Sequence, residues 1–209
     1  GFTPDAQFPA IFCEKGTSNF LAGTKIYNKG EIDVEYFGGG VAANVVPPVC
    51  KLIVNGPLKV TPEEGITVTE ENGKTIVEAT GFSAHGSTPE LGVNAVVKLL
   101  NAVKENDFGG DFQQLVNFIL EEIGNETNGK SLDILYQDEE TGETTVNLGV
   151  VKYDGEEMSF TLDIRYPKNG DAEVIDDKVI NRINSYNFDV LKKTNNKLLY
   201  FNVTKIKEI

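Results

Sequence analysis

The chain has 209 residues, with 40% hydrophobic and 24% charged residues, as expected for a globular protein with one good-sized domain or two small ones. A formal net charge of −13 and the absence of any Lys/Arg cluster argue against a nucleic-acid partner, because phosphate binding needs clustered cations. No apolar run approaches the roughly 18 to 20 residues that span a bilayer, so we expect no membrane partner.

Cys13 and Cys50 are the two cysteines of the chain, too few for a disulfide framework. Both lie in apolar runs, which favours free, buried thiols in a reducing cytoplasm and leaves a single bridge as the alternative. The sequence does not start with methionine, and we expect it to be a piece of a longer protein.

Alternating or apolar runs predict strands along most of the chain. A loop and a short strand at Phe8–Phe12 open it, and the further predicted strands cover 32–37, 49–54, 66–70, 75–82, 144–153, 158–166, 188–191 and 198–203. The turn signals Glu71-Asn72-Gly73 and Asp154-Gly155 join two pairs of these strands into hairpins.

Helical spacing predicts three longer helices and a short one near Leu132. The first starts at Ser87 or Thr88, where Pro89 and Glu90 complete the capping signals, and runs to about Asn106. The second covers about 112–123. The third covers about 172–185, with its inward side chains predicted to be Val174, Val179, Ile180 and Ile183.

This order of elements predicts an α+β fold with antiparallel sheets and helices on one face. A weak internal echo of strands, turns and helices predicts two ferredoxin-like halves, 17–125 and 126–197, although no residue-level repeat can be aligned. Gly38-Gly39-Gly40 lacks the strand and helix of a dinucleotide-binding site, and we expect a bend or bulge that lets the backbone approach another segment closely.

Three polar residues are candidates for chemistry. His85, the single histidine, lies in a glycine-bounded turn before the predicted helix, where it could meet an anion or simply be a histidine without a role. Arg165 could clamp a carboxylate with its guanidinium fork, or pair with Asp163 on the same face of its strand. Asn44 could reach a ligand, or be a turn residue.

One histidine, without an HExxH or GxSxG motif, is not enough for a self-contained hydrolase. Four segments, however, resemble motifs of PepV-type dipeptidases in the M20 metallopeptidase family. They are the opening segment 1–9 with Glu14-Lys15-Gly16, then Gly39-Gly40 with Asn44-Val45-Val46-Pro47, then 84–95 around His85, and 162–167 around Arg165. The histidine segment is the closest match.

The resemblance implies a two-domain enzyme whose catalytic domain holds two zinc ions, or manganese in some members, with an inserted lid that closes over a dipeptide. The family's catalytic metal motifs are absent here. The resemblance therefore identifies 1–16 as a lead-in from the missing catalytic domain, 17–197 as the lid, and 198–209 as the return segment. Asp5 matches a carboxylate metal ligand, whereas Gln7 stands where the family usually has Glu.

The resemblance also assigns roles to the three candidates. His85 would stabilise the oxyanion, Arg165 would hold the terminal carboxylate and Asn44 would bind polar atoms of the substrate. We expect the isolated chain to be inactive and to hold no metal by itself. Two alternatives remain: the lid of another M20 hydrolase, such as an aminoacylase or tripeptidase, and a stand-alone ligand-binding or dimerisation module.

Overall fold

The computed structural model describes residues 13–200, so the predicted strand 8–12, Asp5 and the last part of 198–203 lie outside it. The main strands are β2 (Gly16–Lys25), β3 (Asp33–Gly39), β4 (Val49–Asn55), β5 (Ile66–Glu71), β6 (Lys74–Thr80), β9 (Thr145–Tyr153), β10 (Glu157–Tyr166) and β11 (Asp189–Asn196). Short strands are β1 (Cys13–Glu14), β7 (Gln137–Asp138), β8 (Gly142–Glu143) and β12 (Leu199–Tyr200).

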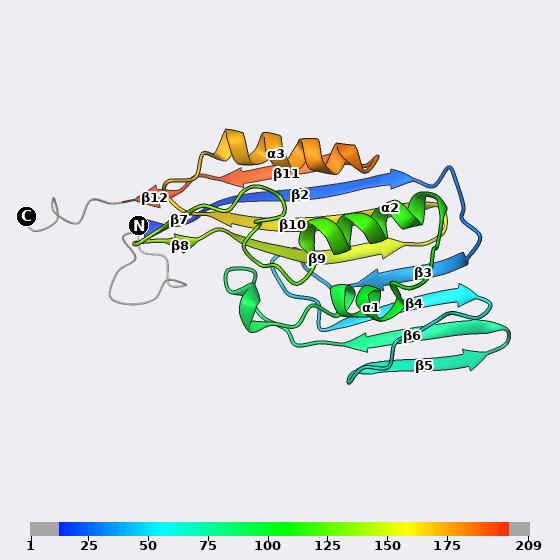
Figure 1. Cartoon of the computed structure of the whole chain (residues 1–209). Helices are drawn as coiled ribbons and strands as arrows, with labels where there is room; N and C mark the ends of the chain where they lie inside the picture. Colours follow the sequence, from blue (N-terminus) through cyan, green and yellow to red (C-terminus); the bar gives the residue numbers. More distant parts are fainter. Residues whose placement is uncertain (1–12, 201–209) are drawn as a thin grey trace, which may run out of the picture.

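The eight main strands form one antiparallel sheet in the order β11-β2-β10-β9-β3-β4-β6-β5 (Figure 1). The predicted α+β class is therefore confirmed. The sheet runs without a break through both ranges proposed as halves, and β2 of the first range pairs with β10 and β11 of the second. The boundary at residue 125 stays a prediction.

Strand β2 was not predicted from the sequence. Its buried positions Ser18, Phe20 and Ala22 alternate with half-buried ones, but two of these three side chains are small, so the hydrophobic alternation is weak. Pairing on both sides holds the strand in the sheet, from Gly16 opposite Tyr166 to Lys25 opposite Glu157. Neighbouring strands here outweigh a weak local preference.

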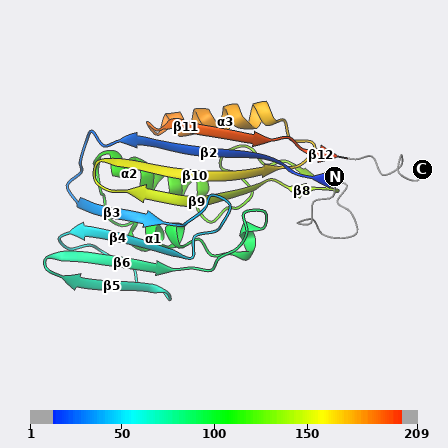
Figure 2. The ribbon, with the colours of Figure 1, turned by 180° about the vertical axis from the view of Figure 1, so that it is seen from behind.

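The helices α1 (Ala95–Val103), α2 (Gly110–Phe118) and α3 (Ala172–Ser185) cover one face of the sheet, and the view from behind shows the other face without a helix over it (Figure 2). The core lies between these layers. Phe118 of α2 stacks on Phe160 of β10 at 4.6 Å between ring centroids and contacts Phe188 at 6.1 Å. No helix among residues 13–200 is long and apolar enough to cross a membrane.

The first helix begins later than predicted. Residues Pro89–Leu91 form only a 3-10 turn, and the side chain of Thr88 makes no capping hydrogen bond. Helix α1 starts at Ala95, where the carboxamide oxygen of Asn94 accepts hydrogen bonds from the backbone of Val96 and Val97. The predicted cap at Ser87 or Thr88 is therefore wrong, and the turn that carries His85 does not adjoin the N-terminus of α1.

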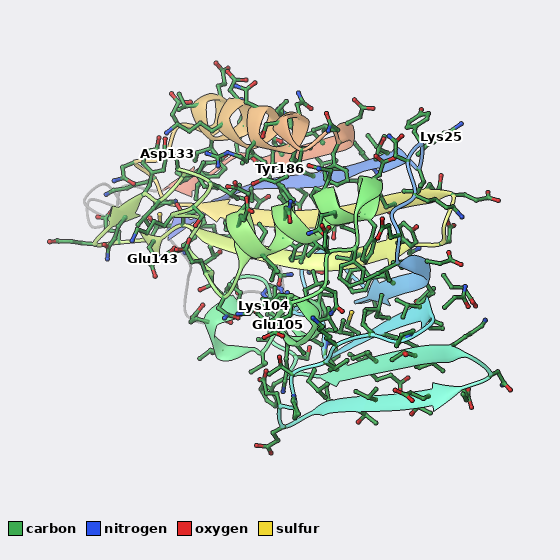
Figure 3. The ribbon with its side chains drawn as sticks, turned by 45° about the vertical axis from the view of Figure 1, so that its right-hand side comes forward. Lys25, Lys104, Glu105, Asp133, Glu143 and Tyr186 are labelled. Carbon is green, nitrogen blue, oxygen red and sulfur yellow. The ribbon has the colours of Figure 1, made fainter. Side chains whose placement is uncertain are left out.

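Two further predictions about helices are corrected. Val179 and Ile183 of α3 are buried as predicted, but Val174 is 42% exposed and the neighbouring Ile175 is buried in its place. The segment around Leu132 is a turn rather than a helix. Helix α2 continues as a π-helical turn, Ile119–Ile123, where the carboxylate of Glu122 accepts a hydrogen bond from the hydroxyl of Tyr186. Tyr186 lies at the end of α3 (Figure 3).

Replacing Phe118 by alanine should lower the free energy of unfolding by about 3–5 kcal/mol, because the cavity would remove contacts with two other rings of the core. Val174→Ala, on an exposed position, should change it by less than about 0.5 kcal/mol. Denaturant unfolding followed by circular dichroism measures both. Equal stability losses in the two variants would contradict the assigned core.

Candidate functional site

A loop between β3 and β4 lies against β9. Gly40 has a φ of +84°, and a Cβ atom there would collide with the carbonyl of Gly149. A Cβ atom at Gly149 would in turn collide with the backbone of Ala43. The carboxamide of Asn147 donates a 2.7 Å hydrogen bond to the carbonyl of Ala43 and fixes the loop. The close approach expected of the glycine run is therefore confirmed, with β9 as its partner.

A second loop, which carries His85, is joined to the first by backbone hydrogen bonds. The amide of Val46 donates to the carbonyl of Ala84 at 2.9 Å, and the amide of Gly86 donates to the carbonyl of Asn44 at 2.7 Å. His85 and Val45 thus form an isolated antiparallel bridge. The two predicted residues Asn44 and His85 are held next to each other by backbone contacts.

Gly86 brings this loop pair onto β10. The residue is buried, and a Cβ atom would collide with Oδ2 of Asp163 and lie 3.2 Å from the Cα of Asn44. The hydroxyl of Thr145 on β9 donates to the Gly86 carbonyl at 3.4 Å. Glycine is required here because the loop, the strand and the carboxylate meet at one point.

The imidazole of His85 is exposed, and its Nδ1 atom is engaged within its own turn. The backbone amide of Ser87 donates to Nδ1 at 3.2 Å, and the Ser87 hydroxyl lies 2.8 Å from the same atom. An Nδ1 that accepts these hydrogen bonds places the proton of the neutral ring on Nε2. His85 therefore offers an N–H donor that points away from its turn.

Arg165 is paired with Asp163, the alternative that the sequence left open. Oδ2 of Asp163 accepts from Nε at 3.3 Å and from Nη2 at 3.2 Å. The Asp163 side chain is 2% exposed and that of Arg165 is 21% exposed. Burial raises the pKa of Asp163, while the charges of Arg165 and His85 act in the opposite direction.

This pairing leaves part of the guanidinium group available for a further hydrogen-bond acceptor. A guanidinium has five N–H donors in a planar fork, and Asp163 occupies the edge formed by Nε and Nη2. Nη1 has no hydrogen-bond partner among residues 13–200. The outer edge of Arg165 can therefore still receive a carboxylate, held in a fixed plane by Asp163.

Asn44 is exposed, and its carboxamide makes no hydrogen bond to another residue within 13–200. Asp5, the predicted metal ligand, lies outside the described residues. Within them, no group of three His, Cys, Asp or Glu side chains could hold a metal ion. Cys50 is buried and Cys13 half-buried, both as free thiols, and burial raises the pKa of each.

An open groove of about 810 Å³ lies beside Arg165. Its lining comes from the ends of β1, β2, β10 and β11 and from the His85 turn: Glu14, Lys15, Thr17, Ser87, Arg165, Asn196 and Lys197. Ser87 belongs both to this groove and to the hydrogen bonds of His85. The groove thus connects Arg165 with the turn that carries His85.

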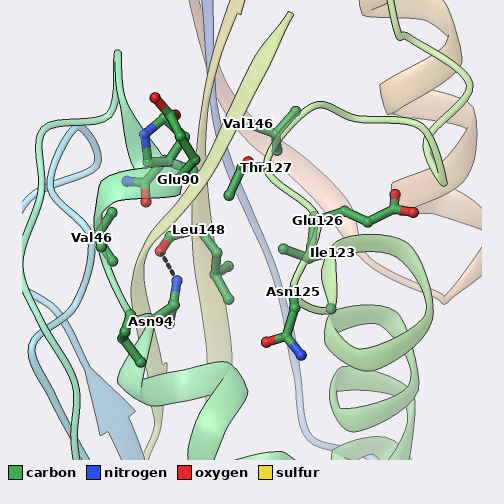
Figure 4. Close-up of a pocket in the computed structure, with 14 residues that line it drawn as sticks. Val46, Glu90, Asn94, Ile123, Asn125, Glu126, Thr127, Val146 and Leu148 are labelled. Carbon is green, nitrogen blue, oxygen red and sulfur yellow. Dashed lines mark hydrogen bonds between the residues drawn. The ribbon is translucent and has the colours of Figure 1, made fainter.

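A second, smaller cavity of about 260 Å³ lies between Asn94, the end of the π-helical turn and β9 (Figure 4). The carboxamide of Asn94 donates to the Leu148 carbonyl at 2.9 Å, so the residue that caps α1 also ties this helix to the sheet. Glu90 and Glu126 are the charged residues in its lining. We assign the cavity a structural role in positioning the segment that follows His85.

The sequence predicted Asp163 only as an ion-pair partner that would keep Arg165 from binding a substrate. It did not predict Gly86, Lys15 and Thr17 as residues of the site. The two-residue spacing of Asp163 and Arg165 was a sufficient signal for their pairing. Thr17 lies directly opposite Arg165 in the sheet. That neighbour could not be found without β2, the strand that the hydrophobic pattern failed to predict.

No established family profile matches the chain. Over 193 residues it is 30% identical to the protein named putative dipeptidase YtjP of Bacillus subtilis (strain 168), an alignment that covers 85% of this chain and 42% of that protein. It is 29% identical over 213 residues to putative dipeptidase SAB1611c of Staphylococcus aureus (strain bovine RF122 / ET3-1), covering 91% and 44%. The chain thus spans less than half the length of the curated relatives it matches.

Gly86→Ala should lower the free energy of unfolding by about 1–3 kcal/mol, because the added methyl group must displace Asp163 or the Asn44 backbone. Ser83→Ala, at an exposed position of the same loop, should have little effect. Denaturant midpoints together with amide chemical shifts measure the change and its location. An unchanged midpoint, with shifts confined to residue 86, would contradict the close contact.

Proposed function

We propose that this chain is the substrate-binding lid of a metal-dependent dipeptidase of the M20 type. The observation that carries the proposal is the contact of Gly86 with both Asn44 and Asp163, because it gathers His85, Asn44 and Arg165 at one end of the sheet. The similarity to proteins named as dipeptidases supports peptide hydrolysis as the activity of the longer protein.

The path of the chain supports an inserted lid. Strands β1 and β12 pair antiparallel, Cys13 with Tyr200 and Glu14 with Leu199, so the chain enters and leaves the sheet at the same place. A domain inserted into another domain needs its two crossing points close together. Glu14, Lys15 and Lys197 lie next to this crossing and also line the groove, so in this proposal the candidate site is close to the junction with the rest of the enzyme.

In this proposal the side chains of Arg165 and His85 bind different parts of a dipeptide. The outer edge of the Arg165 guanidinium binds the C-terminal carboxylate, and Asp163 keeps that edge oriented. The Nε2–H of His85 donates to the oxygen of the scissile carbonyl as negative charge develops on it. The free carboxamide of Asn44 binds a polar atom of the peptide between them.

In this proposal, zinc or manganese ions bind to a part of the longer enzyme outside residues 13–200. The described side chains offer no cluster of three donors, and His85 already uses Nδ1 within its own turn. No step that we assign to His85, Asn44 or Arg165 passes through a metal ion. We propose that lid closure brings these three residues to a metal site held by the rest of the longer enzyme.

In the longer enzyme, made from the complete reading frame, His85→Ala should lower kcat roughly 100- to 1,000-fold, as loss of an oxyanion donor does. KM should change much less, because the interaction forms fully only in the transition state. Ser83→Ala serves as the control from the same loop. Near-normal turnover in the His85 variant would exclude the oxyanion role.

Arg165→Lys should raise KM for free dipeptides by roughly tenfold or more, since lysine cannot replace a bidentate clamp that Asp163 holds in plane. The wild-type enzyme should cleave dipeptides with an amidated C-terminus poorly. For these substrates Arg165→Lys should cause no further rise in KM. Wild-type cleavage of acids and amides at equal rates would contradict the role of Arg165. If the wild-type enzyme prefers N-acyl amino acids or tripeptides, the chain would instead be the lid of an aminoacylase or a tripeptidase.

The 209-residue chain alone should not hydrolyse dipeptides, with or without added zinc or manganese, because the catalytic part lies elsewhere in this proposal. Product analysis after long incubation tests this, with the longer enzyme as the positive control. Metal-dependent turnover by the chain alone would contradict the lid assignment. A longer enzyme without peptidase activity would favour the stand-alone ligand-binding or dimerisation module.

A further inference from the structure

The groove beside Arg165 differs in charge from the rest of the molecule. The chain as a whole carries 32 acidic and 19 basic residues, whereas the groove is lined by the cations Lys15, Arg165 and Lys197 and by one acid, Glu14. Arg165 is paired with Asp163, but Lys15 and Lys197 still leave an excess of positive charge around the groove, which makes it a local site for anions in an acidic protein. The groove is also large, about 810 Å³, within the range of pockets that bind small molecules.

The ammonium group of Lys15 is held in place without a direct ion pair among the described residues, although the charges of Glu143, Glu90 and Asp138 act on it. The side chain is half-buried, and its Nζ donates to the backbone carbonyl of Glu143 rather than to a carboxylate. An ammonium group has three donors, so two remain for a ligand. Burial lowers the pKa of Lys15; the charges of Glu143 and Glu90 oppose this shift, and that of Arg165 adds to it.

Thr17 provides a further polar group at this place. It lies opposite Arg165 in the pairing of β2 with β10, and it lines the groove. Its Oγ1 atom is buried and has no hydrogen-bond partner among residues 13–200. A buried hydroxyl without a partner is unfavourable unless a ligand or water satisfies it. Lys197, exposed at the rim, has no ion pair with another described residue.

We infer that the groove selects dipeptides whose C-terminal residue is acidic. The main-chain carboxylate of that residue binds Arg165, and its side-chain carboxylate binds Lys15, with Thr17 at the base of the groove and Lys197 at the rim. This inference rests on the proposed function and specifies its substrate. Ser87, which contacts both the groove and His85, links this subsite to the oxyanion donor.

The test compares isosteric substrates in the longer enzyme. Ala-Glu should exceed Ala-Gln in kcat/KM by about tenfold, the size of a charge-assisted hydrogen bond in a partly buried site. Lys15→Met should bring this ratio close to one, Lys15→Arg should keep most of it, and Lys197→Met should lower it partly. A higher salt concentration should also lower the ratio.

Lys25→Met is the matched control. Lys25 ends the same strand, about 30 Å from Lys15 along β2, and lies at the other end of the sheet from Glu143 (Figure 3). This variant should leave the ratio unchanged. A wild-type ratio near one, or a preference that survives Lys15→Met together with Lys197→Met, would overturn the inference while leaving the dipeptidase proposal intact. A longer enzyme that cleaves no dipeptide would overturn both.

A binding measurement on the 209-residue chain tests the groove without catalysis. N-acetylglutamate, which resembles the C-terminal half of Ala-Glu, should shift the amide signals of Lys15, Thr17 and Ser87 at lower concentration than N-acetylglutamine does. Lys15→Met should remove the difference between the two ligands. Equal binding of both ligands to the wild-type chain would contradict the acidic subsite.

Discussion

The buried carboxylate of Asp163 is the interaction on which the rest of the site depends. It lies near the end of β10, on the sheet face without helices, with its side chain 2% exposed, and burial disfavours its ionised form. Arg165 offsets part of that cost with two hydrogen bonds. The same oxygen, Oδ2, lies against Gly86, so one carboxylate helps to position both the guanidinium of Arg165 and the turn that carries His85.

The two faces of the sheet differ in polarity. The helical face is a continuous apolar core, with rings of α2 and β10 at its centre. The opposite face is polar near the end of β10, where Asp163, Asn147 and Thr145 are buried beneath the two loops. Successive side chains of a strand point to opposite faces of the sheet. The strand register that the apolar side chains fix in the core therefore also fixes the positions of the polar groups on the other face.

Much of this architecture follows from sequence patterns alone. Helix α3 has the bounds that its periodicity predicts, and the hairpin at Asn72-Gly73 has the two-residue turn that its residues favour. The predicted hairpin at Asp154-Gly155 is also present, with four residues between the paired Tyr153 and Met158. Strand β2 escaped detection because its stability comes from two neighbouring strands rather than from its own hydrophobicity. The start of α1 differs from the prediction because Pro89 and Glu90 begin only a 3-10 turn and Ser87 bonds to His85 instead of capping a helix. His85, Asn44 and Arg165 were found as single residues, but their shared surroundings depend on contacts that local sequence does not encode.

The position of β2 also has a consequence for how the chain folds. Gly16 pairs with Tyr166 and Lys25 with Glu157, so β2 cannot pair until β10, which is synthesised much later, has left the ribosome. Such distant pairing slows folding and leaves a strand with open edges in the meantime. The segment 33–80, whose strands pair with their sequence neighbours, can form first. The groove, which needs β2, β10 and β11 together, is then among the last features to form, and the nascent chain acquires its anion site only when synthesis of this region is nearly complete.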